Sequence, residues 1–291
     1  LNDSKIRDLI EHLSKRKLGN KDYPADLMGD AYEILLKKFA DDSKAQAGEF
    51  YTPRSVVRLL VHILDPQPGE TVYDPACGSG GMLIEAIRYM HDDSLCCGSI
   101  FGQEKNVVNA AIAKMNLFLH GASDFNVMQG DTLRDPKILQ GGNIAKFDCV
   151  IANPPFSLEN WGATEWSSDK YKRNIYGTPS DSCGDYAWIQ HMICSMSSGK
   201  GRMAVVMPQG ILFRGNQEVE IRKQLVESDL IEAVVSLGDK LFYGTGLSPC
   251  FLIIRRMKPA HHSGRILMID GSKILTQKRA VSYTHLTLPT I

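Results

Sequence analysis

TVYDPACGSGG, residues 71–81, is the stretch of the chain that decides the expected fold. Its apolar start, Thr71-Val72-Tyr73, is typical of a buried strand, and an amphipathic helical pattern begins after Gly81. Between them lie three glycines in four residues, more than a simple turn requires. Open α/β sheets bind ligands where a strand ends in such a loop before a helix. The stretch therefore predicts a strand, a ligand-binding loop and a helix, although a tight turn without a ligand remains an alternative.

Short apolar runs alternate with helical patterns after this stretch. Strands are expected at 98–103, 125–129, 147–152 and 202–207, and helices at 106–120, 185–197 and 216–227. The alternation predicts an α/β fold with a mostly parallel sheet that helices cover on both faces. Two further runs, 230–237 and 250–255, are joined by a glycine-rich loop and predict an antiparallel edge.

The chain divides into three segments by the texture of its sequence. Residues 1–47 are charged and helical in pattern, and we expect them to be the end of a helical N-terminal domain. Residues 48–270 carry the α/β pattern of the main domain. Residues 271–291 form a C-terminal tail, and because 281–291 continue no pattern of the domain, we expect this tail to be partly non-native. Because it starts at Leu1 without an initiator Met, the chain is expected to be a fragment.

The composition narrows the possible classes of protein. No apolar run approaches the ~20 residues that span a bilayer, and no secretory pattern is present, so we expect a cytoplasmic protein without a membrane partner. The seven cysteines form no CxxC pair and no zinc-type spacing, which predicts reduced thiols and no metal site. Basic and acidic residues both number 33. If DNA is the substrate, this neutral balance predicts a partner that supplies much of the affinity for DNA.

The glycine-rich loop begins with an acid, Asp74, which would repel a phosphate but suits a cationic ligand. S-adenosylmethionine carries a sulfonium and an ammonium group. Glu104 ends the next apolar run, where an acid can accept ribose hydroxyls, and Asp131 ends the third run, where it could face an adenine edge. Either acid alone is more often a helix cap or a solvated loop residue. Together they predict an S-adenosylmethionine pocket lined by Asp74, Ala76, Gly78, Ser79, Gly80, Gly81, Glu104 and Asp131.

Asn153-Pro154-Pro155-Phe156 follows the apolar run 147–152, so it is expected at the same edge of the sheet. An aromatic amine such as adenine N6 is a poor nucleophile because its lone pair is delocalised into the ring. If the Asn153 side-chain oxygen and the Pro154 carbonyl accepted both N–H bonds, the nitrogen would become pyramidal and aim its lone pair at the methyl group. Phe156 offers a face on which a base swung out of a duplex can stack. We predict that Asn153, Pro154, Pro155 and Phe156 are catalytic, although a Pro-Pro turn with a core aromatic is the alternative for the tetrapeptide alone.

The stretch GEFYTPR, residues 48–54, precedes a helix expected over Ser55 to Leu64. Thr52 is predicted to cap this helix, with Pro53 at its first position. The exposed amides of the helix start could bind the carboxylate of the methionine portion of the cofactor. A bare helix start is the alternative. The candidate cofactor-binding residues are Glu49, Phe50, Tyr51, Thr52, Pro53 and Arg54.

The order GEFYTP, DPACGSGG, a strand-end acid and NPPF closely resembles the modification (M) subunit of type I restriction-modification systems, which belongs to the N6-adenine DNA methyltransferases. The likeness runs from about Leu27 to Asp270 and includes GDYAW at 184–188 and PQGILF at 208–213. It implies a class I, Rossmann-like methyltransferase domain at 48–270. It also implies cofactor contacts by residues 49–54, 79–81 and Glu104, with 153–156 as the catalytic loop.

The resemblance further implies partners and an activity. A specificity (S) subunit would read the DNA target, with two M subunits for each S subunit, and a restriction (R) subunit would complete the nuclease. The chain departs from the family in having a shorter helical N-terminal region and no complete helical C-terminal extension. Two other functions stay open: methylation of a glutamine amide in a protein, for which an Asn-Pro-Pro-aromatic loop is also suited, and a non-catalytic scaffold that binds cofactor and partner subunits.

Overall fold

The computed structural model describes residues 52–90, 98–238, 242 and 247–272, the strand backbone at 275–277 and 284–286, and two isolated residues, Arg7 and Glu11. The predicted helical segment 1–47 and most of the predicted tail 271–291 lie outside the described residues. No helix in the described part of the chain is long and apolar enough to cross a bilayer.

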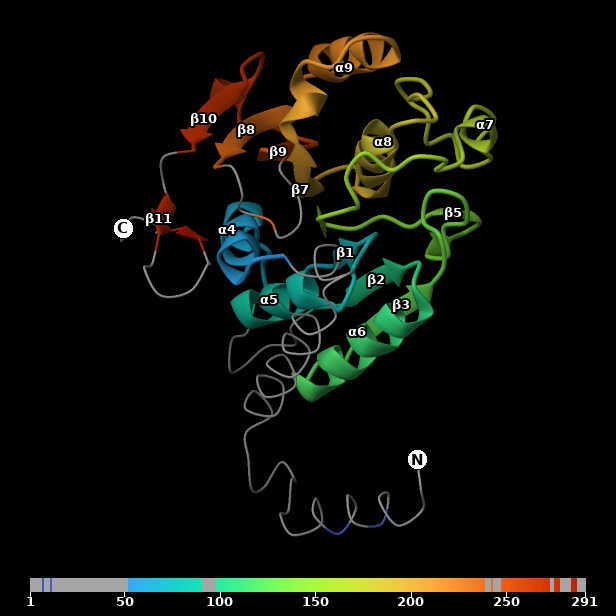
Figure 1. The fold of residues 1–291 in the computed structure, drawn as a ribbon, viewed down its shortest axis with the longest axis vertical. Helices are drawn as coiled ribbons and strands as arrows, with labels where there is room; N and C mark the ends of the chain where they lie inside the picture. The colour runs from blue at the N-terminus through green and yellow to red at the C-terminus, as the bar shows by residue number, and fades with distance from the viewer. Residues whose placement is uncertain are drawn as a thin grey trace.

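An eight-stranded sheet forms the centre of the molecule, in the order β10-β8-β9-β7-β6-β1-β2-β3 (Figure 1). The strands are β1 (Val72–Asp74), β2 (Ile100–Glu104), β3 (Phe125–Gln129), β6 (Cys149–Ala152), β7 (Arg202–Pro208), β8 (Ile231–Leu237), β9 (Pro249–Arg255) and β10 (Leu267–Gly271). All neighbours pair in parallel except β9, which is antiparallel to both β7 and β8. The predicted mostly parallel α/β sheet is confirmed.

The antiparallel strand lies further inside the sheet than the sequence indicated. The predicted runs 230–237 and 250–255 do pair with each other as β8 and β9, but β9 also pairs with β7. A further strand, β10, then joins β8 in parallel and forms the edge of the sheet. The edge strand is therefore parallel, and the antiparallel strand is enclosed on both sides.

Helices cover both faces of the sheet, as predicted (Figure 1). Alternate residues of β7 point to opposite sides: Ala204 and Val206 belong to one apolar core, whereas Met203, Val205 and Met207 belong to the other. The first core also contains α4 (Arg54–Leu64), α5 (Gly81–Met90) and α6 (Val107–Leu119), and the second contains α8 (Asp185–Ser195) and α9 (Gln217–Glu227). The smaller elements are α7 (Ala163–Trp166), η1 (Gln209–Leu212), η2 (Ala260–His262), β4 (Leu139–Gln140), β5 (Asn143–Ile144), β11 (Leu275–Gln277) and β12 (Thr284–Leu286).

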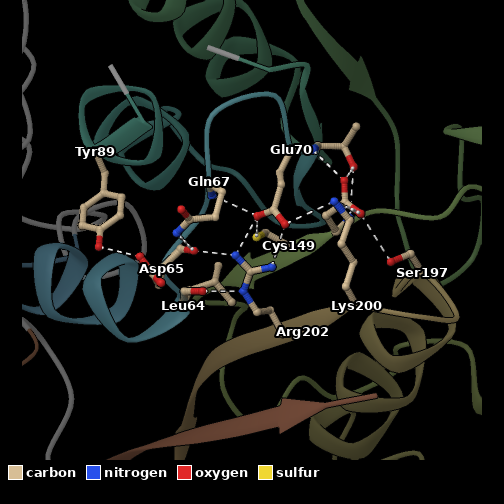
Figure 2. Close-up of polar contacts among 11 residues, drawn as sticks. Leu64, Asp65, Gln67, Glu70, Tyr89, Cys149, Ser197, Lys200 and Arg202 are labelled. Atoms are coloured by element: carbon tan, nitrogen blue, oxygen red, sulfur yellow. Dashed lines mark hydrogen bonds and ion pairs between the residues drawn. The ribbon is translucent and has the colours of Figure 1, made fainter. Parts of the chain in front are cut away.

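A buried ion pair fastens the amino-terminal edge of the sheet to the end of α4 (Figure 2). Arg202, the first residue of β7, lies 2.6 Å from the Glu70 carboxylate and donates hydrogen bonds to the carbonyls of Leu64 and Asp65. Both side chains of the pair are only 8% exposed. Lys200 reaches the same carboxylate from solvent, at 3.4 Å with 66% of its side chain exposed. We call Arg202, Glu70 and the two carbonyls the amino-edge clamp.

Candidate functional site

Five parallel strands bring the predicted site residues to one edge of the sheet. Strand β1 lies between β2 and β6, and these in turn pair with β3 and β7, all in parallel. Their carboxyl ends therefore meet, and Asp74, Glu104 and Asn153 stand at or directly after the ends of β1, β2 and β6. These carboxyl ends lie opposite the amino-edge clamp, at the other end of the strands.

The glycine-rich loop between β1 and α5 is a compact turn held by its own backbone. Asp74 Oδ1 accepts a hydrogen bond from the Ala76 N–H at 2.9 Å, and the Gly80 N–H donates to the Cys77 carbonyl at 2.8 Å. Gly78 and Gly80 have φ values of +54° and +85°, which a side chain would strain. The glycines are thus required by backbone conformation, and they leave the loop without side chains at these positions.

Glu104 contributes to the loop directly. Its Oε2 accepts the Gly78 N–H at 2.9 Å, and its Oε1 accepts the Asn106 N–H at 2.7 Å. Asn106, and not the acid, caps the following helix by accepting from the Val108 N–H. Each carboxylate oxygen can accept more than one hydrogen bond, so Glu104 still has capacity for ligand hydroxyls.

Asp74 is buried, with 2% of its surface exposed. Burial is the main cause that raises the pKa of its carboxyl to about 8, the Ala76 N–H opposes the rise, and the negative charge of Glu104 adds to it. A cation beside Asp74 would lower this pKa, so the binding of a positively charged ligand group and the ionisation of Asp74 would favour each other.

Asp131 has the contacts of a turn residue. Its Oδ1 accepts from the backbone N–H groups of Leu133 and Arg134, both at 3.2 Å, and its Oδ2 lies 2.9 Å from Lys105 Nζ. The buried Arg173 stabilises this turn, because its guanidinium donates hydrogen bonds to the carbonyls of Thr132 and Leu133. Asp131 lies near the expected edge, but its hydrogen bonds shape the loop.

Residues 153–156 form the loop after β6. Asn153 donates from Nδ2 to Thr52 Oγ1 at 2.9 Å, while its Oδ1 is buried and has no hydrogen-bond partner among the described residues. Pro154 is buried, Pro155 is exposed, and Phe156 is half-buried with its ring 6.0 Å from that of Phe242. A buried oxygen without a donor costs about 1–3 kcal/mol. The loop thus presents an acceptor that an incoming N–H group would satisfy.

The start of α4 differs from the prediction. The helix begins at Arg54, Pro53 is its N-cap, and no side-chain hydrogen bond caps it within the part of the chain that the structure describes. The Thr52 hydroxyl interacts with Asn153 instead of the helix amides. The predicted threonine cap is therefore wrong, because the side chain has a partner 101 positions away. The predicted residues Glu49, Phe50 and Tyr51 lie outside the described residues.

Asp185 contacts the residue that follows the candidate catalytic loop, and the sequence predicted no such role for it. It is fully buried at the start of α8, and its Oδ1 accepts the Ser157 N–H at 2.8 Å, directly after the catalytic-loop candidates. Its Oδ2 pairs with Arg214, which follows η1. Ser157 has φ +50°, so this hydrogen bond supports a strained turn. The only sequence signal was its place in the GDYAW motif.

The chain resembles known proteins over most of its length. A family model described as N-6 DNA Methylase matches residues 24–287. The methylase subunit of the type I restriction enzyme MjaVII from Methanocaldococcus jannaschii is 38% identical over 275 residues, 92% of this chain and 46% of the relative. The HindI methylase subunit from Haemophilus influenzae is 34% identical over 253 residues, which are 86% of this chain and 55% of the relative. The chain spans about half the length of the curated relatives it matches.

Solved structures show the same likeness. The methyltransferase subunit of a type I restriction-modification system from Streptococcus thermophilus has a TM-score of 0.80 at 33% identity, over 90% of this chain and 55% of that chain. A Listeria monocytogenes protein described as a class I S-adenosylmethionine-dependent methyltransferase has a TM-score of 0.69 at 16% identity, over 88% of this chain and 76% of that chain. The second likeness shows the fold alone, and the predicted class I methyltransferase fold is confirmed. Since the family model matches most of its residues, the chain belongs to the N-6 DNA methylase family.

Proposed function

We propose that this chain is the catalytic core of a type I modification subunit, which transfers the methyl group of S-adenosylmethionine to N6 of adenine in DNA. Residues 48–270 would be its methyltransferase domain. The observation that carries the proposal is the Oδ1 atom of Asn153, a buried acceptor without a partner at the carboxyl end of β6. The names of the similar methylase subunits support DNA, rather than a protein glutamine, as the substrate.

The catalytic loop would act on the amine of the base. Asn153 Oδ1 and the Pro154 carbonyl would each accept one N–H of adenine N6, which localises the nitrogen lone pair for attack on the methyl group. Pro155 stiffens the loop because its ring fixes φ. Phe156 would stack against a base that has left the duplex. The half-buried ring and its contact with Phe242 would hold this face in position.

The described residues at the glycine-rich loop fit S-adenosylmethionine, which supplies an electrophilic methyl group on its sulfonium when it is bound. The buried Asp74 carboxyl suits a cationic ligand, and residues 76–81 allow close approach of the backbone. Glu104 would accept ribose hydroxyls, and Asp131 would lie toward the adenine ring of the cofactor. The backbone of Glu49, Phe50, Tyr51, Thr52, Pro53 and Arg54 would hold its methionine end.

Partner subunits would supply the recognition of the DNA target and much of the affinity for DNA. The chain's formal charge is zero, so we propose that a specificity subunit provides target recognition and much of the DNA affinity. Two modification subunits would bind each specificity subunit, a restriction subunit would complete the nuclease, and the complex would work in the cytoplasm.

The proposed function is tested by co-expressing the chain with the specificity subunit encoded beside its gene. The purified complex is incubated with labelled S-adenosylmethionine and duplex DNA, and the methylated positions are mapped. We expect N6-methyladenine at one recurring sequence and no label on a release-factor protein. Label on the protein alone would favour the glutamine methyltransferase, and no transfer to either substrate would favour the scaffold.

We expect Glu104→Gln to weaken S-adenosylmethionine binding at least about tenfold, because one amide oxygen replaces two acceptors and the charge is lost. Since the Gln side chain has only one oxygen acceptor, either the Gly78 N–H or the Asn106 N–H would lose its hydrogen bond to residue 104. Isothermal calorimetry of the complex measures the affinity, with the exposed Glu159→Gln as a matched control. Equal affinity in both variants would remove Glu104 from the pocket.

The affinity for S-adenosylmethionine should also increase with pH. Burial raises the pKa of Asp74 to about 8, so the carboxyl is mostly neutral near pH 7 and must lose its proton to attract the cation. Binding is therefore expected to be about tenfold weaker near pH 7 than on the plateau near pH 9. The control is Asp74→Asn, whose amide does not titrate. Calorimetry of this variant measures how much of the pH dependence of the affinity comes from ionisation of the ligand itself. Identical pH slopes for both proteins would contradict the role of Asp74.

A further inference from the structure

The contact between Thr52 and Asn153 joins two parts of the chain that the sequence separates by 101 positions. The Asn153 carboxamide donates from Nδ2 to Thr52 Oγ1 at 2.9 Å, and its other end, Oδ1, is buried without a partner. We propose that Thr52 is a positioning residue, which holds the Asn153 carboxamide by its amino end so that its oxygen faces the acceptor amine. This inference rests on the proposed function of the catalytic loop.

The two ends of a carboxamide have nearly the same shape but opposite hydrogen-bonding character. If the group rotated by half a turn, its N–H donors would face the N–H donors of adenine N6, and the amine would lose the acceptor that localises its lone pair. In the observed arrangement the hydrogen bond to Thr52 occupies the amino end. After such a rotation the Thr52 hydroxyl could donate to Oδ1 instead, so the hydrogen bond fixes the place and plane of the carboxamide, and the amine, which only donates, selects the end that faces it. The hydroxyl therefore holds the carboxamide where its oxygen can accept from the amine.

The helix start supplies an independent argument. Thr52 precedes α4, where a threonine side chain commonly caps a helix and stabilises it by about 1 kcal/mol. Among the described residues no side-chain hydrogen bond caps α4, and Thr52 is next to the N-cap residue Pro53. The Thr52 hydroxyl, one position before the N-cap, therefore contacts the catalytic loop.

The role differs from cofactor binding. Residues 49–54 are proposed to hold the methionine end of S-adenosylmethionine through backbone amides, which a change of the Thr52 side chain leaves in place. A positioning role predicts a loss of turnover at saturating cofactor. A cofactor contact by the hydroxyl predicts a higher KM for S-adenosylmethionine with unchanged kcat.

The test compares Thr52→Val, which has the shape of threonine without the hydroxyl, with Thr52→Ser, which keeps the hydroxyl. In the complex with the specificity subunit, we expect Thr52→Val to lower kcat about five- to thirty-fold, the effect of one lost hydrogen bond in a buried site. Thr52→Ser should remain within about twofold of the wild type, with the Kd for S-adenosylmethionine unchanged in both. Thr52→Ala is the second variant without a hydroxyl, and melting temperatures verify that each protein is folded.

A double-mutant cycle decides whether Thr52 acts through Asn153. Residual turnover of Asn153→Ala should not fall further when Thr52→Val is added, because the group that Thr52 positions is already absent. Full turnover by Thr52→Val, a change in KM alone, or an additive loss in the double variant would each overturn the inference while the proposed function stands. A wild-type complex that transfers no methyl group to adenine would overturn both.

Discussion

Asn153→Ala should lower the kcat of methyl transfer to adenine about 10²–10³-fold while the Kd for S-adenosylmethionine stays within about twofold of the wild type. The variant removes an oxygen that has no hydrogen-bond partner among the described residues, together with the hydrogen bond from Nδ2 to Thr52. The oxygen is expected to interact with adenine N6 most strongly as the nitrogen becomes pyramidal. Loss of one such preorganised group lowers kcat by about 10²–10³-fold.

The experiment measures single-turnover methylation and cofactor affinity on the same complex, with Asn143→Ala as the matched control. Asn143 is exposed in the β4–β5 hairpin, so its replacement should leave turnover unchanged. Turnover by Asn153→Ala that equals this control would disprove the proposed mechanism. A loss of cofactor affinity with unchanged turnover at saturation would move Asn153 from the acceptor site to the cofactor site.

Elements with local signals were predicted closely. The strand expected at 125–129 is β3 without any change of boundary, and the helix expected at 106–120 is α6 at 107–119. Both depend on features that neighbouring residues carry, such as the apolar period and the cap at Asn106. A sequence read locally therefore locates these elements to within one or two residues.

Strand order required contacts that no local pattern contains. Strand β9 inserts between β7 and β8, and its pairing with β7 joins residues far apart in the chain. The residues that form β10 were not predicted as a strand, although Leu267, Met268 and Ile269 form a short apolar run. All three are exposed at the sheet edge. Their parallel pairing with β8, not burial, makes them a strand.

The candidate site shows the same division. Asp74, Glu104 and Asn153 could be placed together from sequence, because parallel strands bring their carboxyl ends to one edge. The hydrogen bonds of Thr52 to Asn153 and of Ser157 to Asp185 could not, since they span 101 and 28 positions. The pattern of a helix start favoured a cap at Thr52, but in the structure the Thr52 hydroxyl accepts a hydrogen bond from Asn153 instead.

Arg202→Met breaks the buried ion pair of the amino-edge clamp and is expected to lower the free energy of unfolding by about 3–5 kcal/mol. The substitution leaves Glu70 buried without its partner and frees the carbonyls of Leu64 and Asp65. Lys200→Met is the matched control. It removes a cation from the same carboxylate, but Lys200 is 66% exposed, so the cost should be about 0–1 kcal/mol. Denaturant unfolding of the full chain, followed by the fluorescence of the buried tryptophans, measures both.

The same clamp predicts how stability depends on pH. Burial alone would raise the pKa of the Glu70 carboxyl, but hydrogen bonds from Arg202 and the Gln67 N–H, with the charge of Arg202, lower it from 4.5 to about 2. Because the folded-state pKa is depressed, this stabilisation is complete above about pH 4.5 and is lost as the pH falls toward 2. The difference corresponds to about 3 kcal/mol. Glu70→Gln should therefore flatten the loss of stability in this interval, and Arg202→Met should do the same, because it restores an ordinary or raised pKa to Glu70. If either variant kept the wild-type acid profile, or if Arg202→Met cost no more than Lys200→Met, the ion pair would not be what holds the end of α4 to the sheet.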